Sequence, residues 1–183
     1  MAYYGAKELA EGFRTVRKNT LVIAEDVGEQ HYGFRATPET RTIGQTLVHI
    51  AVSPKFAEQI HAVERRTTMA GFDFMAFFGP MQAAEQASYT KAQIIALLTE
   101  NGDRLAKWLD TLSDEFLGEQ VSMPGMTPAS KSRFEMLLGM KEHEMHHRAQ
   151  LMLLERMVGV VPHLTRQMEA RMAEMMKAQQ AAK

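Results

Sequence analysis

Four stretches of the sequence place apolar residues at steps of three and four, which is the period of an amphipathic α-helix. They cover residues 6–27, 42–60, 90–112 and 130–159. Helices with apolar stripes bury those stripes by packing side by side around one core. The periodicity therefore predicts an all-α fold, a four-helix bundle. Because no stretch alternates with period two, we expect no substantial sheet.

Capping signals mark where these helices begin. Three of them open with a capping box, in which the N-cap and N3 side chains each satisfy a free backbone N–H. The pairs are Thr42 with Gln45, Thr90 with Gln93, and Ser132 with Glu135. Pro54 lies inside the second stretch and cannot donate a hydrogen bond to the Ile50 carbonyl. It predicts a kink there, or a stop at Ser53 followed by a restart.

The segments between the predicted helices are long. Residues 28–41, 66–89 and 114–129 each exceed the short turns that join antiparallel neighbours, so we expect at least one crossover connection. Residues 71–81 read GFDFMAFFGPM, with four phenylalanines and two methionines. This segment is interpreted as a plug over one end of the core or as the apolar wall of a pocket, and the two are compatible.

Composition narrows the class of protein. The chain has 183 residues, 45% of them hydrophobic, which is enough for one domain with a real core. We expect that domain at residues 1–165 and a partly disordered helical tail at 166–183. The absence of cysteine excludes a thiolate metal site and fits the cytoplasm. A net charge of −1 without a basic face argues against nucleic acid, and no apolar run is long enough to span a membrane.

His143 and His147 lie four residues apart in KEHEMHHRAQ, on the fourth predicted helix. That spacing puts both rings on one helix face, one turn apart. The same face is apolar on both sides, with Met140 before the pair and Leu151 after it. Neighbouring buried imidazoles need polar partners, and one shared metal ion would satisfy both. A hydrogen-bonded or edge-exposed pair is the alternative.

His49, in TLVHIAVS, is a third candidate ligand. It lies beside the apolar stripe of the second predicted helix, where a histidine alone is more often a boundary residue. With His143 and His147 it would form an open three-nitrogen site of the catalytic kind, leaving a position for water or substrate. Imidazole donors suit zinc or nickel first, and iron, manganese or copper are further options.

The run His143-Glu144-Met145-His146-His147 also matches the H-E-x-x-H signature of zinc proteases, in which the glutamate is the general base. The extended form of that signature fails, because it needs glycine and histidine where this chain has Gln150 and Leu153. The form with a downstream glutamate would need Glu169 or Glu174, in the tail. A zincin-like protease is therefore the weaker hypothesis.

Three segments in order resemble one known family, the DinB/YfiT-like metal-binding four-helix bundle proteins. They are HYGFRATPETRTIGQTLVHIA, KAQIIALLTENGDRLAKWLDTLSDEFL and KEHEMHHRAQLMLLERMVGVVP, and the resemblance covers residues 5–162. It implies that His49, His143 and His147 are the metal ligands and that the protein is a homodimer. It also implies metal-dependent transfer of a low-molecular-weight thiol such as bacillithiol or mycothiol. Pro54 and the tail after Thr165 depart from the family pattern.

The remaining histidines and acids near the cluster are expected to be peripheral. We place Glu144 at the surface as an exposed acid and His146 at the surface or next to a ligand, while Gln150 and Arg148 could orient a ligand. By their places in loops or helix ends, the other histidines are expected on the surface; these are His31, His61 and His163. No catalytic acid or base is assigned.

Two classes of function follow. The first is a metal-dependent enzyme, a transferase or hydrolase, that activates an external thiol or a water for a small-molecule substrate. The second is a non-enzymatic, dimeric metal-binding or ligand-binding protein.

Overall fold

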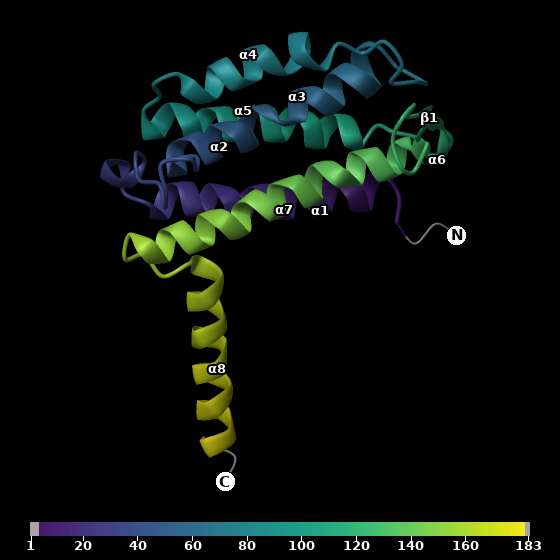
Figure 1. The fold of residues 1–183 in the computed structure, drawn as a ribbon. Helices are drawn as coiled ribbons and strands as arrows, with labels where there is room; N and C mark the ends of the chain where they lie inside the picture. The colour runs from purple at the N-terminus through teal and green to yellow at the C-terminus, as the bar shows by residue number, and fades with distance from the viewer. Residues whose placement is uncertain (1–3, 182–183) are drawn as a thin grey trace.

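The computed structural model describes residues 4–181, and four long helices form its body (Figure 1). They are α1 (Ala6–Asp26), α2 (Ile43–Val52), α5 (Lys91–Leu109) and α7 (Arg133–Met157). All four lie in the stretches that the periodicity marked, and the three capping boxes predicted for α2, α5 and α7 are present. The expected four-helix bundle is confirmed.

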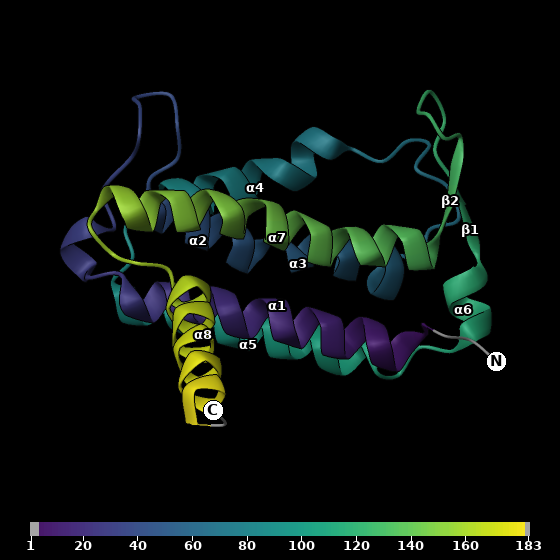
Figure 2. The ribbon, with the colours of Figure 1, turned by 90° about the horizontal axis from the view of Figure 1, so that it is seen from below.

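The bundle is not a simple up-and-down arrangement. Helix α1 packs on α5 and α7, and α2 packs on the same two helices, so α1 and α2 lie diagonally across the core. Figure 2 shows α1 and α7 running in one direction and α2 and α5 in the other. Both the connection from α1 to α2 and that from α5 to α7 therefore cross an end of the bundle. This explains the long segments 28–41 and 114–129.

The second predicted helix is divided at Pro54 into two helices. Ser53 keeps helical backbone angles, φ −54° and ψ −35°, between α2 and the short helix α3 (Pro54–Ala57). A π-helical turn, η2 (Glu58–Val63), follows directly. Helix α2 thus ends at Val52 and α3 begins at Pro54, as the alternative of a stop and restart expected, and proline is tolerated there because the first turn of a helix needs no donor.

The segment 66–89 was expected to be a connector, and this expectation is wrong. It contains helix α4 (Phe74–Gln86), which begins with an Asp73 cap on the Ala76 backbone N–H and packs along α2. Figure 1 shows α4 lying over α2 and α3. Gly79 and Pro80 obscure the helical pattern in the sequence, but Pro80 is tolerated because tertiary contacts of the phenylalanines stabilise α4.

Smaller elements close the ends of the bundle. They are the 3₁₀ turn η1 (Glu29–His31), helix α6 (Asp114–Gly118), and strands β1 (Gln120–Ser122) and β2 (Ser130–Ser132). The strands pair antiparallel, with Val121 opposite Lys131. These three-residue strands agree with the expectation of no substantial sheet.

Helix α8 (His163–Ala181) projects away from the bundle (Figures 1 and 2). Most of its side chains are exposed. The tail expected at 166–183 is helical as far as Ala181, and the last two residues of that range, 182 and 183, lie outside the described residues. Among residues 4–181, every helix is too short or too polar to cross a membrane.

Three apolar clusters make up the core, and a buried ion pair lies between the two larger ones. One cluster includes Phe13 and Leu137, and the other includes Ile23 and Leu151. Between them the guanidinium of Arg17 contacts the carboxylate of Glu144, with Nε–Oε1 at 2.9 Å.

Candidate metal centre

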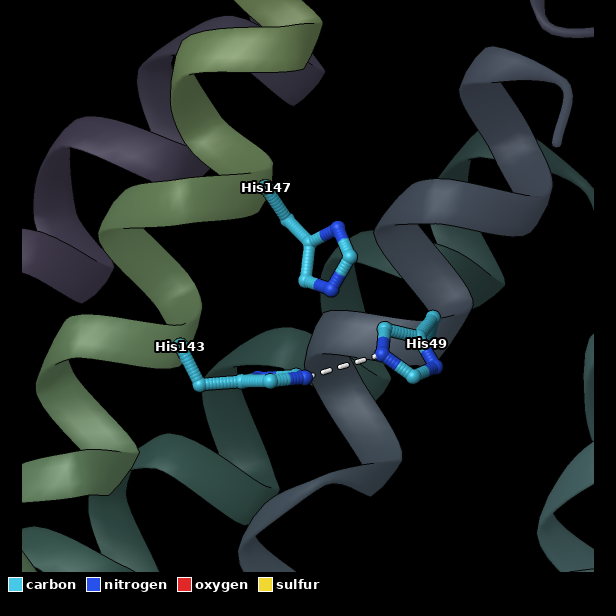
Figure 3. Close-up of side chains that lie close together, drawn as sticks. All are labelled: His49, His143 and His147. Carbon is cyan, nitrogen blue, oxygen red and sulfur yellow. Dashed lines mark hydrogen bonds between the residues drawn. The ribbon is translucent and has the colours of Figure 1, made fainter. Parts of the chain in front are cut away.

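His49, His143 and His147 come together in the structure (Figure 3). Each offers one ring nitrogen, and the three nitrogens lie within 4.8 Å of one another. The Nε2 atoms of His49 and His143 are 3.0 Å apart. His147 is buried and the other two are half-buried. The structure thus brings together the three residues that were selected from the sequence.

Helix geometry explains this convergence. His143 and His147 are one turn apart on α7, so their rings project from the same face. Helix α2 runs antiparallel beside α7 and places His49 opposite them, as Figure 3 shows. Leu47 and Leu151 are completely buried next to these residues and hold the two helices in register.

Hydrogen bonds orient two of the three rings toward a common point. Nδ1 of His49 lies 2.6 Å from Oε1 of Glu85, and Nδ1 of His147 lies 2.9 Å from Oε1 of Gln150. A carboxylate and an amide oxygen only accept, so each Nδ1 carries the proton. Each Nε2 then presents its lone pair. Carboxylate or carbonyl partners of this kind accompany most metal-bound histidines.

The charge state of the rings also fits a metal. Burial lowers the pKa of His143 to about 4, and the neighbouring His147 and His49 lower it further. Burial likewise lowers the pKa of His147. Both rings are therefore neutral at pH 7, which is the form that binds an ion. Two imidazole nitrogens on one tetrahedral zinc lie about 3.3 Å apart, close to the 3.0 Å between His49 and His143. The donor set fits a divalent metal.

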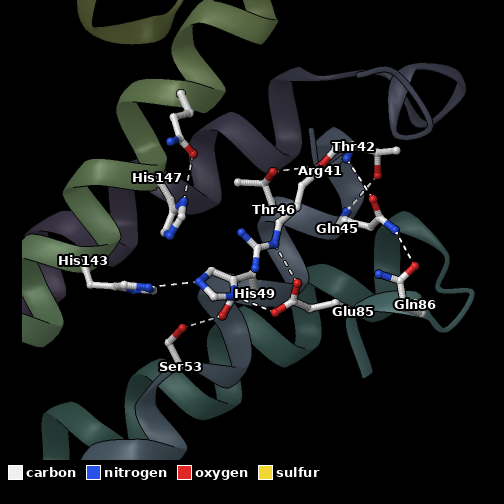
Figure 4. A network of polar contacts seen from close by, with 11 residues as sticks. Arg41, Thr42, Gln45, Thr46, His49, Ser53, Glu85, Gln86, His143 and His147 are labelled. Atoms are coloured by element: carbon white, nitrogen blue, oxygen red, sulfur yellow. Dashed lines mark hydrogen bonds and ion pairs between the residues drawn. The ribbon is translucent and has the colours of Figure 1, made fainter. Parts of the chain in front are cut away.

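Glu85 and Arg41 were missed from the sequence (Figure 4). The second carboxylate oxygen of Glu85 accepts a hydrogen bond from Nε of Arg41 at 2.6 Å. Glu85 belongs to α4, and Arg41 immediately precedes the cap of α2. If residues 74–86 are recognised as a helix, Glu85 lies one turn after Met81, on the face toward α2. This spacing is the sequence signal from which Glu85 could have been predicted.

A cavity of about 520 Å³ opens beside the histidines. Its walls come from α2, α3, α4 and α7, and its lining residues are Arg41, His49, Ser53, Phe56, Phe78, Met81, Gln82, Glu85, Gln86, Met140 and His143. Phe78 and Met81 belong to the phenylalanine-rich segment 71–81, and Met81 also packs into the core. Both interpretations of that segment, as core cover and as pocket wall, therefore hold.

The expectation that Glu144 is an exposed acid is wrong. Glu144 is 2% exposed, and its carboxylate accepts hydrogen bonds from Nε and Nη2 of Arg17. Its burial was not predicted because nothing in the sequence around Glu144 indicates that α1 brings the guanidinium of Arg17 next to it. Its carboxylate bonds to Arg17 and does not line the cavity beside His49 and His143, which argues against Glu144 as the general base that the zincin hypothesis requires.

Two of the histidines expected on the surface are buried. His61 and His163 are each 2% exposed. Nδ1 of His61 accepts a hydrogen bond from Nη1 of Arg133 at 3.0 Å, and burial lowers the pKa of His61 to about 4. Nε2 of His163 lies 3.2 Å from Oδ1 of Asn19 and anchors the start of α8. His146 is exposed beside Gln150, as expected.

Known proteins share this architecture. YjoA, a DinB-like protein from Bacillus subtilis, is 18% identical, with a TM-score of 0.61 over 83% of this chain and 92% of its own. YfiT from Bacillus subtilis, described with an unusual four-helix bundle topology, is 18% identical, with a TM-score of 0.67 over 87% of this chain and 91% of its own. No curated protein matches the sequence. The family model of the DinB superfamily matches residues 13–151, and the chain therefore belongs to the DinB superfamily.

Proposed function

We propose that this protein is a metal-dependent hydrolase in which His49, His143 and His147 hold one divalent ion. The observation that carries the proposal is the convergence of three ring nitrogens, from His49, His143 and His147, beside an open cavity. YfiT, whose fold is similar, is described as a probable metal-dependent hydrolase. A bound divalent ion in a three-nitrogen site supplies Lewis acidity and lowers the pKa of a water molecule.

The chain's own residues prepare this site. Glu85 and Gln150 hold His49 and His147 with their Nε2 lone pairs directed at the common point. The apolar side chains of Phe56, Phe78 and Met81 line the cavity next to it. Their apolar surface lowers the polarity around the reacting group, which strengthens electrostatic interactions there.

A thiol transferase is the second candidate. The cavity reaches His49 and His143 from outside and has room for a molecule larger than water. Because the chain has no cysteine, a thiol nucleophile would come from a low-molecular-weight cosubstrate. We rank it second because YfiT, whose fold is similar, is described as a probable metal-dependent hydrolase.

Metal content is the first test of the proposal. We expect wild-type protein reconstituted with zinc, and separately with nickel, to hold about one ion per chain. His147→Ala should lose that ion, while His146→Ala, a change in the exposed neighbouring histidine, should keep it. Binding of zinc or nickel that is equal in both variants, or absent from the wild type, would contradict the site.

Turnover is the second test. The metal-loaded protein should hydrolyse a p-nitrophenyl ester faster than the metal-free protein, and His147→Ala should abolish the difference. Repeating the reaction with a small thiol separates the two candidates, since rate enhancement that requires the thiol indicates transfer. Metal binding without either reaction across a panel of esters and amides would favour a non-enzymatic binding protein.

A further inference from the structure

The cavity beside the histidines has two chemically different ends. Arg41, Glu85 and Gln86 line one end, where α2 begins and α4 finishes. Phe56, Phe78 and Met140 line the cavity further along α3, α4 and α7. Because α2 and α4 run antiparallel, the start of α2 lies beside the end of α4. Along the chain, His49 comes after Arg41 and before Phe56, and it therefore lies between the two ends of the cavity. A ligand in this cavity therefore meets a polar end, the histidines, and an apolar end.

Arg41 is held next to the histidines by one shared carboxylate. Oε1 of Glu85 contacts Nδ1 of His49 and Oε2 contacts Nε of Arg41, both at 2.6 Å. The two groups bridged by one carboxylate are necessarily close neighbours, and Figure 4 shows the guanidinium beside the His49 ring. The positive charge of Arg41 also lowers the pKa of both His143 and His147, which agrees with this proximity.

The terminal nitrogens of Arg41 are available to a ligand. A guanidinium has five N–H donors, and Glu85 uses the one on Nε. Within the described part of the chain, no acceptor bonds to Nη1 or Nη2 of Arg41, and its side chain is 44% exposed. The carboxylate of Glu85 is fully engaged by Arg41 and His49. The paired Nη donors form the fork that recognises a carboxylate in two parallel hydrogen bonds.

We propose that the substrate carries a free carboxylate, which Arg41 binds, and an apolar acyl group, which lies against Phe56, Phe78 and Met140. The bond to be hydrolysed then lies between these two groups and opposite the histidine nitrogens. An N-acyl amino acid has this pattern: an apolar acyl group, a hydrolysable amide and a carboxylate. This inference rests on the proposed hydrolase function and names its substrate class.

Calorimetric titration tests the assignment without relying on turnover. The probes are N-benzoylglycine and its neutral analogue N-benzoylglycinamide, titrated into zinc-loaded full-length protein. We expect the carboxylate to bind at least tenfold more tightly than the amide, since a charge-assisted bidentate pair is lost in the amide. Arg41→Gln should abolish that preference and leave the affinity for the amide unchanged.

The control variant is Arg35→Gln, which removes an exposed arginine from the same connection. It should keep the tenfold preference, and both variants should retain about one zinc per chain. A preference that survives in Arg41→Gln overturns the proposal, because the carboxylate then binds elsewhere, on the metal included. Equal affinity of the wild type for both probes also overturns it.

The two proposals fail separately. If the protein holds no metal, the hydrolase proposal fails, but the Arg41-dependent preference is still measurable on the metal-free chain. If metal binds and esters are hydrolysed while Arg41→Gln changes neither affinity nor the preference, only the substrate assignment fails.

Discussion

At the scale of single residues, the Arg17–Glu144 pair is the most consequential buried interaction outside the metal centre. Arg17 donates to both oxygens of Glu144 and also to the carbonyls of Ile50 and Leu98. One guanidinium thereby joins α1, α2, α5 and α7. Gly102 leaves room for it, since a Cβ there would lie 2.7 Å from Nη1 of Arg17. Removing one partner of such a pair leaves an uncompensated buried charge.

We therefore predict that Glu144→Gln lowers the free energy of unfolding by about 3 kcal/mol without changing metal stoichiometry. Denaturant unfolding and metal analysis measure the two quantities. The control is Glu142→Gln, two residues away and exposed, which should change the stability little. Loss of hydrolysis in Glu144→Gln at unchanged stability would instead restore Glu144 as a catalytic base.

At the scale of elements, α4 does more than cover the bundle. It supplies Glu85, whose carboxylate fixes the tautomer of His49 and positions Arg41. It also supplies Phe78 and Met81 to the cavity wall. The surroundings of the three histidines therefore depend on an element outside the four main helices, because α4, packed on α2, both bonds to His49 and forms part of the cavity wall.

Replacing the carboxylate that bonds to Nδ1 of His49 should weaken metal binding. We predict that Glu85→Ala lowers zinc affinity about 10–100-fold, because Nδ1 of His49 loses its acceptor. Competition with a chromophoric chelator measures the affinity. Gln82→Ala is the matched control, one turn earlier on α4 and lining the same cavity. Unchanged zinc affinity in Glu85→Ala would show that α4 does not orient the ligand.

At the scale of the whole molecule, two exposed apolar surfaces lie near the C-terminal end of the bundle. On α7, Met145, Leu153 and Met157 are 42%, 61% and 51% exposed and follow a four-residue spacing with Ala149. On α8, four methionines are between 56% and 59% exposed; they are Met168, Met172, Met175 and Met176. Contiguous apolar surface of this kind marks an interaction site, and methionine adapts readily to a partner.

We propose that these surfaces mediate a homodimer in which α8 of each copy lies along α7 of the other. Because each chain carries both surfaces, a twofold axis can pair α8 of each copy with α7 of the other at the same time. We predict that Met172→Glu converts the dimer to a monomer, as measured by sedimentation. Met75→Glu, which changes an 85% exposed methionine on α4, should leave the dimer intact. A monomeric wild type, or a dimeric Met172→Glu, would contradict this assignment.

The sequence by itself determined the four bundle helices and the pairing of His143 with His147. Capping boxes at Thr42, Thr90 and Ser132 are satisfied within three residues, so they act whatever the rest of the chain does. The spacing of His143 and His147 is likewise a property of one helix. The third histidine required the family resemblance, because no local pattern links α2 to α7.

Only the tertiary structure decided what surrounds those histidines. The contact between Arg41 and Glu85 spans 44 residues, and that between Arg17 and Glu144 spans 127. The stability of α4 despite Pro80 comes from packing on α2. Burial of Glu144 and His61 likewise depends on cations from other helices, Arg17 and Arg133. Whether a polar group can be buried depends on hydrogen-bonding or charged partners that are distant in sequence. The spacing of neighbouring residues does not reveal those partners.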